Sequence, residues 1–471
     1  MDARAPQRRS GISLGPVRLG IFSGAAMPVA ALATPLSVYL PNYYASHLGL
    51  SLAAVGGIFG LVRLIDIGFD PLIAIAINET RSPFGRFRPW MLIGAPILML
   101  AVWAIYMAAP GVGSLYLLGW LLVLYAGFSI LGLAHASWAA ALVPEYHGRS
   151  TIYGWMQAVG VVGLVIALLL ASLSSDAAAG IHAMGYLVLG LTVVTTALCV
   201  GVIGEPKRPE AHTAVTLREY WTMFARHSLL KVLAADLLLA LGPAITGALY
   251  LFFFQQALGY TRRQTGLLLV VYIFAGLFGA PFWAAISRRL GKHRTVILGC
   301  VLYGFAQALV FVLPHAQMRL MIPGMFFAGF VVSCFTFLIR AMLADIGDEV
   351  RLDIGKDRTP LLYGLITLTS KVGSTISVFI TFSILAAFGF QAKEGVVNTG
   401  MPLNALVACY VIVPVLTMFF GAAMLRGYRL DATRHDEIRA TLEERDRAAA
   451  AEESVIVDSM LPPSITHDVR G

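Results

Sequence analysis

Three charged residues interrupt an apolar part of the chain. Arg63, Asp66 and Asp70 lie in the first half of RLIDIGFDPLIAIAINETRSPFGRFRPW, residues 63–90. The two aspartates are four residues apart, so on a helix both carboxylates share one face, one turn apart. Like charges this close repel each other unless a cation or a proton is bound between them. The pair is therefore a candidate site for Na+, Li+ or H+. The alternative is that Arg63, one turn earlier, neutralises one carboxylate in an ion pair that only fixes packing.

The composition indicates that these charges lie in a membrane. The chain has 471 residues, 58% of them hydrophobic and 13% charged, with a mean hydropathy of +0.77, which is typical of an integral membrane protein. A charge at bilayer depth costs about 2.5 to 3.5 kcal/mol, so such residues usually face the interior of a helix bundle. Stretches long enough to span a bilayer are predicted at 20–44, 52–78, 90–109, 114–143, 150–173, 182–203, 229–256, 264–287, 295–314, 318–344, 360–388 and 402–426.

The positions of the basic residues predict the orientation of these spans. The formal net charge is +8, and arginines and lysines concentrate at both termini and in the loops that follow even-numbered spans. The other loops carry only Arg262, Arg263, Arg319 and Lys393. This asymmetry predicts that both termini lie in the cytoplasm and that the protein resides in the cytoplasmic (inner) membrane. It explains the basic excess without a nucleic-acid partner.

A repeated loop pattern predicts two pseudo-symmetric six-helix bundles. The turn FGRFRPW after the second span matches LGKHRTV after the eighth, and the paired residues are Gly85 with Gly291, Arg86 with Lys292, and Arg88 with Arg294. Such turns hold cations near neighbouring carboxylates and helix ends, in contacts that can break and reform as two bundles rock. We therefore expect an all-α membrane protein with bundles at 1–204 and 229–426, a cytoplasmic loop at 205–228 and a polar tail at 427–471 containing a short solvated helix.

These motifs resemble a known family. D-x-x-x-D-P at residues 66–71, followed by NETRS and GRFRPW, is similar to the signature of the glycoside-pentoside-hexuronide:cation symporters, the melibiose permease family of the major facilitator superfamily. MLADIGDEVRLDIGKDRTPLLYGLITLTSKVGS, residues 342–374, is a second match. The resemblance implies that Asp66 and Asp70 bind the coupling cation, that Lys371 approaches them from the other half of the chain, and that Arg63 is the helix-two arginine of the family.

The chain departs from this family at the sugar-binding positions. The helix-one acid aligns near Ala30, the helix-four acid near His135 or Ala136, and the helix-five arginine near Gln157. Sugars usually require amides and an aromatic platform, so the candidate substrate pocket consists of Trp138, Trp155, Gln157 and His135. Other readings remain open: Trp138 as core packing, Gln157 as a bond between helices, and His135 as a buried core histidine or a proton carrier.

The predicted function is a cation-coupled symporter that works by alternating access and carries a sugar or glycoside-type solute. A lysolipid or other amphiphile is an alternative solute, and a non-transporting receptor or scaffold is an alternative function on the same fold. No nucleophile–base constellation, phosphate loop or Cys/His cluster is present in the sequence, so we expect no enzyme, no cofactor and no metal beyond the coupling ion. A monomer in the lipid bilayer is expected. Asp236 is expected to pair with Lys231.

Overall fold

The fold is known from a computed structural model, which describes residues 15–142, 146–205, 226–314, 316–355, 359–428, 430 and 432–460. Within these residues the secondary structure is helical, with no strand. Twelve helices are long and apolar enough to cross a membrane, and each overlaps one predicted span. The prediction of an all-α protein with twelve spans is confirmed. Most of the central loop (206–225), residues 1–14 and the end of the tail (461–471) lie outside the described residues.

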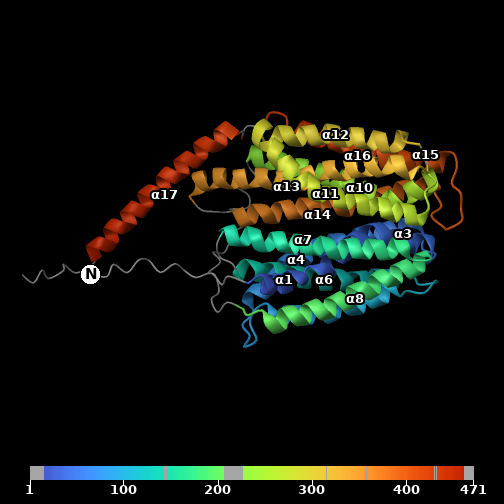
Figure 1. The fold of residues 1–471 in the computed structure, drawn as a ribbon, viewed down its shortest axis with the longest axis horizontal. Coiled ribbons are helices and arrows are strands. Elements are labelled where there is room, and N and C mark those ends of the chain that lie inside the picture. The colour runs from blue at the N-terminus through green and yellow to red at the C-terminus, as the bar shows by residue number, and fades with distance from the viewer. Residues whose placement is uncertain are drawn as a thin grey trace, which may run out of the picture.

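The membrane-length helices lie roughly along one common direction, and the helix at 432–460 is inclined to them (Figure 1). The first span is broken into α1 (Pro16–Gly24), α2 (Met27–Thr34), η1 (Pro35–Tyr39) and α3 (Leu40–Ser46). The remaining elements are α4 (Leu52–Glu79), α5 (Arg88–Tyr106), α6 (Ser114–Leu142), α7 (Tyr146–Leu173), α8 (Ala177–Val202), α10 (His227–Phe252), η2 (Phe253–Ala257), α11 (Arg262–Leu290), α12 (Lys292–Val312), α13 (Met318–Ile354), α14 (Thr359–Ala387), α15 (Met401–Val407), η3 (Ala408–Ile412), α16 (Val413–Met424) and α17 (Ala432–Met460).

Prolines explain the broken first span. Pro28, Pro35 and Pro41 each stand at the start of one of its helical segments. A proline in a helix cannot donate a backbone hydrogen bond and crowds the preceding turn. Here the chain accommodates Pro35 in the π-helical turn η1, whose wider spacing tolerates the lost hydrogen bond.

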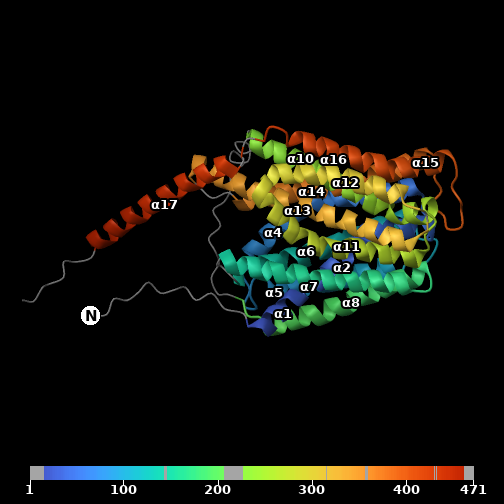
Figure 2. The ribbon, with the colours of Figure 1, turned by 45° about the horizontal axis from the view of Figure 1, so that its top comes forward.

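The helices form two groups that meet along three lines of contact. Within the first group α5 packs on α6 and α8, α4 on α6, and α2 on α7; within the second, α11 and α12 pack on α13, and α10 packs on α14 and α16. Across the groups α4 contacts α14, α7 contacts α11, and α10 contacts η1. One end of the helix bundle carries the start of α1 and the tail helix α17, and we name it the terminal end. The opposite end carries α15, and we name it the far end (Figures 1 and 2). The residue borders predicted for the two bundles stay predictions.

The tail helix is more than a solvated appendage. Ile438 and Leu442 of α17 are buried, and α17 packs against α13. The His435 Nε2 atom lies 3.0 Å from an Asp348 oxygen, and an Arg351 Nη2 atom lies 2.8 Å from an Asp446 oxygen. A helix was predicted here, but the prediction of a short solvated helix was wrong, because α17 has 29 residues and its first turns pack on α13.

Candidate functional site

The two aspartates of α4 face a lysine from the other bundle. The Nζ atom of Lys371, on α14, lies 2.9 Å from Asp66 Oδ2 and also contacts Asp70 Oδ2. The Asp66 side chain is only 3% exposed, while those of Asp70 and Lys371 are each 23% exposed. A single ammonium group thus bridges two carboxylates of the opposite helix and holds α4 against α14 at this level.

The two carboxylates differ in their remaining hydrogen-bond partners. Ser129 of α6 donates a hydrogen bond from its hydroxyl to Asp66 Oδ1 over 3.0 Å. Asp70 Oδ1 is buried and has no hydrogen-bond partner among the described residues. Hard monovalent cations bind to such carboxylate and hydroxyl oxygens, and an unsatisfied buried oxygen is costly unless a ligand meets it. The donor set therefore fits a small cation. Ser129 was not predicted, because a serine within an apolar span carries no distinctive pattern.

Arg63 does not neutralise the aspartates. Its guanidinium carbon lies 5.0 Å from the ring centroid of Tyr125, a cation–π contact. Among the described ion pairs, the partner of Asp66 and Asp70 is Lys371. The alternative in which Arg63 forms the structural ion pair is therefore wrong for this conformation.

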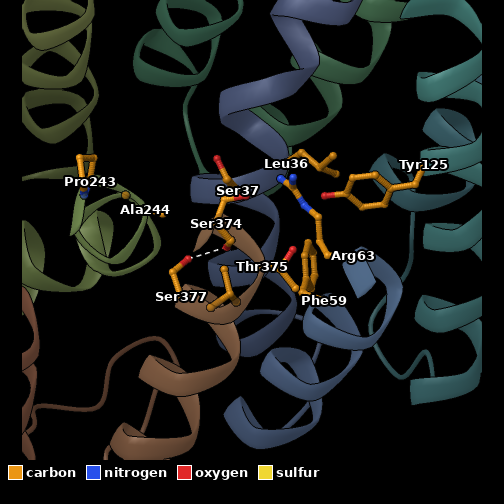
Figure 3. Close-up of a pocket in the computed structure, with 12 residues that line it drawn as sticks. Leu36, Ser37, Phe59, Arg63, Tyr125, Pro243, Ala244, Ser374, Thr375 and Ser377 are labelled. Atoms are coloured by element: carbon orange, nitrogen blue, oxygen red, sulfur yellow. Dashed lines mark hydrogen bonds between the residues drawn. The ribbon is translucent and has the colours of Figure 1, made fainter. Parts of the chain in front are cut away.

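Arg63 instead lines a small polar cavity between the bundles (Figure 3). This cavity, which we call the polar chamber, has a volume of about 150 Å³. Its lining includes the hydroxyl groups of Ser37, Ser374, Thr375 and Ser377 and the side chains of Arg63 and Tyr125, together with the apolar residues Leu36, Phe59 and Val378. The Thr375 hydroxyl donates to the carbonyl of Lys371 over 2.7 Å, so the α14 part of this lining is the helical turn that follows the bridging lysine.

A second cavity, the tyrosine chamber, adjoins the first. It has a volume of about 240 Å³ and is lined by Tyr250, Tyr272, Tyr303, Gln307 and Tyr410, together with aliphatic side chains. The two chambers share Ser37, Pro243 and Gly247 as lining residues. Sequence reasoning missed this chamber, although Tyr303 and Gln307 are spaced one helical turn apart and so face the same side of α12.

Two of the predicted pocket residues lie in the packing of the first bundle instead. Trp138 is fully buried, edge-on to Phe22 with ring centroids 5.7 Å apart and stacked on Phe87 at 6.4 Å. The His135 Nε2 atom lies 2.9 Å from the Phe22 carbonyl oxygen. Neither residue lines the two chambers, so the structure supports the packing interpretation for both.

The other two predicted pocket residues lie on α7. Trp155 is 49% exposed, and Gln157 is also exposed. Neither is among the residues that line the two chambers. In this conformation the two chambers are built on α2, η1, α4, α6, α10 to α14 and η3, and none of the four predicted pocket residues lines them.

The two matching turns are stabilised within their own bundles. Gly85, with φ +108°, precedes Arg86, Phe87 and Arg88, whose backbone N–H groups donate to the Glu205 carboxylate over 2.5 to 2.9 Å. The Arg86 and Arg88 side chains donate to carbonyl oxygens of residues 77 and 203. The first turn therefore fixes its loop against helix ends.

In the second turn Gly291 has φ +85°, and Lys292 Nζ lies 2.6 Å from Asp345 Oδ1. Arg294 lies in the first turn of α12. The predicted ion pair between a loop cation and a carboxylate is therefore formed by Lys292 and Asp345.

Asp236 has different partners from those expected. Its Oδ2 atom accepts hydrogen bonds from Thr369 Oγ1 at 2.6 Å and Ser370 Oγ at 2.8 Å. Lys231 donates to the carbonyl oxygens of Arg426 and Gly427. The predicted pairing of Asp236 with Lys231 is wrong, because Lys231 reaches the end of α16 while Asp236 binds the turn before Lys371.

Polar contacts join the bundles at the far end. The His47 Nε2 atom, after α3, lies 2.7 Å from Glu394 Oε2 in the loop after α14. Arg262, at the start of α11, donates to the Ala177 carbonyl over 3.2 Å. α4 also packs closely on α14 at this end. The space beside Gly56 is too small for a side chain, because an added Cβ atom would lie 2.8 Å from Phe382 Cβ. The far end is therefore closed in this structure.

The chain is similar to known transporters over most of its length. Residues 21–432 match a family described as MFS/sugar transport protein. The putative glycoside/cation symporter YagG of Escherichia coli (strain K12) is 24% identical over 427 residues, covering 88% of this chain and 91% of the relative. The isoprimeverose transporter of Lactiplantibacillus pentosus is 23% identical over 448 residues, covering 90% and 89%. Among solved structures, the nucleoside transporter NupG has a TM-score of 0.61 at 14% identity, covering 87% of this chain and 98% of that one, a likeness of fold.

Proposed function

Because this chain belongs to the MFS/sugar transport protein family, we propose that it is a cation-coupled symporter for a sugar or glycoside-type solute. The chain is an integral membrane transporter and not an enzyme. Relatives named as a glycoside/cation symporter and an isoprimeverose transporter support the sugar class and the coupling.

One observation carries the proposal: Lys371 bridges Asp66 and Asp70 across the two bundles. In the proposed cycle Asp66 and Asp70 bind either the ammonium group of Lys371 or the coupling cation. Lys371 neutralises the pair when no cation is bound. Entry of Na+, Li+ or a proton between Asp66 and Asp70 removes the attraction for the lysine, so the contact between α4 and α14 weakens.

The consequence is a shift between two states of the carrier. A ligand shifts such an equilibrium only through its different affinity for the two states. The far-end contacts of His47 and Arg262 support a carrier closed at that end and accessible from the terminal end. Loss of the Lys371 bridge favours the state that is open at the far end. A bound solute shifts the same equilibrium by the difference between its affinities for the two states. With the termini in the cytoplasm, as the basic loops predict, we assign this arrangement to the inward-facing state of the proposed cycle.

The test is cation-dependent thermal stability of the purified protein in detergent. Na+ and Li+ are titrated against choline at fixed ionic strength, and pH is then varied, for the wild type, Asp70→Asn and Asp236→Asn. A ligand that binds only the folded state stabilises it by about 2.7 kcal/mol at a concentration of about 100 Kd. We expect Na+ or Li+ to raise the melting temperature of the wild type and of Asp236→Asn, the matched buried carboxylate, but not of Asp70→Asn.

The other outcomes are equally informative. If neither metal ion acts but part of the pH dependence of the wild-type melting temperature is lost in Asp70→Asn and retained in Asp236→Asn, the coupling ion is the proton. If Asp70→Asn retains the full cation response, the proposed site is refuted. Uptake of labelled sugars, with labelled lysolipid as the competing class, into proteoliposomes under a cation gradient then tests the solute.

A further inference from the structure

Three π-helical turns lie at the tyrosine chamber. Ser37 and Val38 of η1 and Tyr410 of η3 line it. The Tyr410 ring stacks on Phe253, the first residue of η2, with ring centroids 3.8 Å apart and ring planes inclined by 5°. All three turns also contact α10. Turns of this kind are rare in proteins and often lie at functional sites, so their convergence makes the chamber a candidate binding site.

Some polar groups of the chamber wall serve the packing of the second bundle. Tyr250 donates a hydrogen bond to the Thr265 carbonyl over 2.9 Å, and the hydroxyls of Tyr303 and Thr246 share a hydrogen bond of 3.2 Å. These bonds join α10 to α11 and to α12. The two tyrosine hydroxyls are therefore already engaged.

Gln307, on α12, is held in an orientation that leaves its carbonyl oxygen unpaired. Its Nε2 atom donates to the backbone carbonyl of Tyr410 over 3.1 Å, which fixes the direction of the carboxamide group. The Oε1 atom has no hydrogen-bond partner among the described residues, although Gln307 is only 4% exposed. A buried acceptor without a partner is costly, so a donor supplied by a ligand would relieve this cost.

Two phenol hydroxyls are unpaired in the same way. Neither Tyr272 nor Tyr410 has a hydroxyl partner among the described residues. Enclosed and unpaired polar atoms do occur in the described chain, for example Tyr106 Oη, but Gln307 Oε1 and these two hydroxyls are not among them. The three atoms are therefore accessible, and because all three residues line the chamber, we place the atoms at its wall.

The charge and the donor set of the chamber define the group that would fit. None of the described residues that line it is charged, so an ionised group there would be buried without a counter-ion. The Gln307 Oε1 atom can only accept, whereas a phenol hydroxyl can donate and accept. The matching group is therefore a neutral hydroxyl that donates to Gln307 and exchanges hydrogen bonds with the two phenols.

We propose that Gln307 determines the solute specificity of the carrier, and that with Tyr272 and Tyr410 it binds one uncharged hydroxyl group of the solute. The inference rests on the proposed function and deepens it, because it assigns recognition to three side chains of the second bundle. A solute held there also meets the first bundle, since Ser37 and Val38 of η1 line the same chamber.

Sugars that lack single hydroxyls test this assignment. Glucose, galactose, xylose, lactose, raffinose and isoprimeverose are titrated against the melting temperature of the purified wild-type protein at saturating coupling cation. Each sugar that binds is then compared with its monodeoxy analogues. We expect one analogue to bind about tenfold more weakly than its parent sugar, because Gln307 Oε1 then stays unpaired.

The variant Gln307→Leu identifies the partner of that hydroxyl. We expect the parent sugar and the sensitive analogue to bind this variant with equal affinity, while the penalties at the other hydroxyl positions stay as in the wild type. A side chain that only supports packing would lower all affinities together and leave their ratios unchanged.

A pair of tyrosine variants provides the control and replaces Gln307→Leu if that protein does not fold. Tyr272→Phe removes a hydroxyl without a described partner, so it should weaken binding of the parent sugar about three- to tenfold and leave the melting temperature without sugar unchanged. Tyr44→Phe removes a buried hydroxyl that donates to the Ile105 carbonyl over 3.0 Å, away from the chamber. It should lower the melting temperature and leave sugar binding unchanged.

The failures of the two proposals are distinguishable. Deoxy penalties that are the same in the wild type and in Gln307→Leu, or sugar binding that Tyr272→Phe leaves intact, overturn the assignment of Gln307 while the symporter remains. A normal cation response without binding of any of the sugars overturns both the sugar class and the assignment of Gln307, and leaves the cation site.

Discussion

Lys371 is the only described cation that contacts both carboxylates of α4. Replacing it with methionine keeps the length of the side chain and leaves Asp66 and Asp70 facing each other. Breaking a buried ion pair by removing one partner costs about 3 to 5 kcal/mol, and the partial exposure of Lys371 and Asp70 favours the lower value. We expect Lys371→Met to lower stability by about 3 kcal/mol without a coupling cation.

The same variant tests competition between the lysine and the coupling ion. Without the ammonium group the ion no longer displaces a bound partner, so it should stabilise Lys371→Met more than the wild type. Unfolding in detergent, with and without the ion that stabilises the wild type, measures both effects. An identical ion-induced shift in the two proteins would show that Lys371 and the ion do not share the site.

His47 gives the far end a dependence on pH. Burial lowers the pKa of His47 below its usual 6.5; Glu394 and Asp176 oppose this shift and Arg262 adds to it. The unfolded chain therefore binds the proton at a higher pH than the folded one, and stability is lost as the pH falls below about 6.5. His47→Gln retains an N–H donor for Glu394 but cannot titrate.

We expect the melting temperature of the wild type to fall more steeply than that of His47→Gln between about pH 7 and pH 5. The difference between the two curves isolates this residue, because the other groups titrate in both proteins. A wild type that becomes relatively more stable in acid would indicate instead that attraction to Glu394 dominates.

At this scale, charged residues were predicted better than aromatic ones. An aspartate within a span has few reasons to be there, so Asp66 and Asp70 were identified from their residue type and spacing, whereas the approach of Lys371, which the structure shows, was implied only by the resemblance to a family. A buried tryptophan serves packing as readily as binding, and Trp138 was assigned to the pocket although it packs against Phe22 and Phe87. Which face of a helix reaches a cavity depends on tertiary packing that the local sequence does not encode.

Glycines determine how closely α4 approaches α14. A Cβ atom on Gly56 would lie 2.8 Å from Phe382 Cβ, whereas one on Gly57 would meet nothing within 4 Å. Overpacking of this kind costs about 1 to 3 kcal/mol, while alanine in place of an unconstrained helical glycine gains up to about 1 kcal/mol. Gly56→Ala should therefore separate the two helices at the far end, and Gly57→Ala should not.

Hydrogen exchange in the far-end halves of α4 and α14 measures this separation. Faster exchange is expected in Gly56→Ala within residues 52–60 and 378–387, together with a lower melting temperature. Equal exchange in Gly56→Ala and Gly57→Ala would contradict the role of this contact in closing the far end.

The spans themselves were predictable, because long apolar runs have few alternatives to a membrane helix. The interruptions within these spans were harder to predict. Pro35 marks the interruption of the first span, but nothing in FFQQA or ACYVI announces the π-helical turns η2 and η3.

On the scale of the whole molecule, the tail helix adds stability to the second bundle. Ile438 and Leu442 are buried, and fully burying such a side chain contributes about 1.5 to 3 kcal/mol. Deleting residues 432–471 should lower the melting temperature of the purified protein while leaving its cation-induced shift unchanged. Loss of the cation response together with stability would instead connect the tail to the coupling site.

The docking of α17 was not predicted because charge dominates its composition. Ile438 and Leu442 are spaced by one helical turn, but two apolar residues among many charged ones do not identify a buried face. The contacts with Asp348 and Arg351 come from the end of α13. Only the length of that helix, which extends to Ile354, brings them within reach of the tail.

In the proposed cycle, the bridge between the two bundles also determines how the carrier responds to voltage. Asp66, Asp70, Arg63 and Lys371 together sum to zero charge, so an empty site of this kind can change sides without moving net charge through the membrane field. One bound cation makes the moving group singly positive, and an electrical potential acts on it by about 2.3 kcal/mol per 100 mV. An inside-negative potential thus favours the loaded step in one direction and leaves the empty return unaffected.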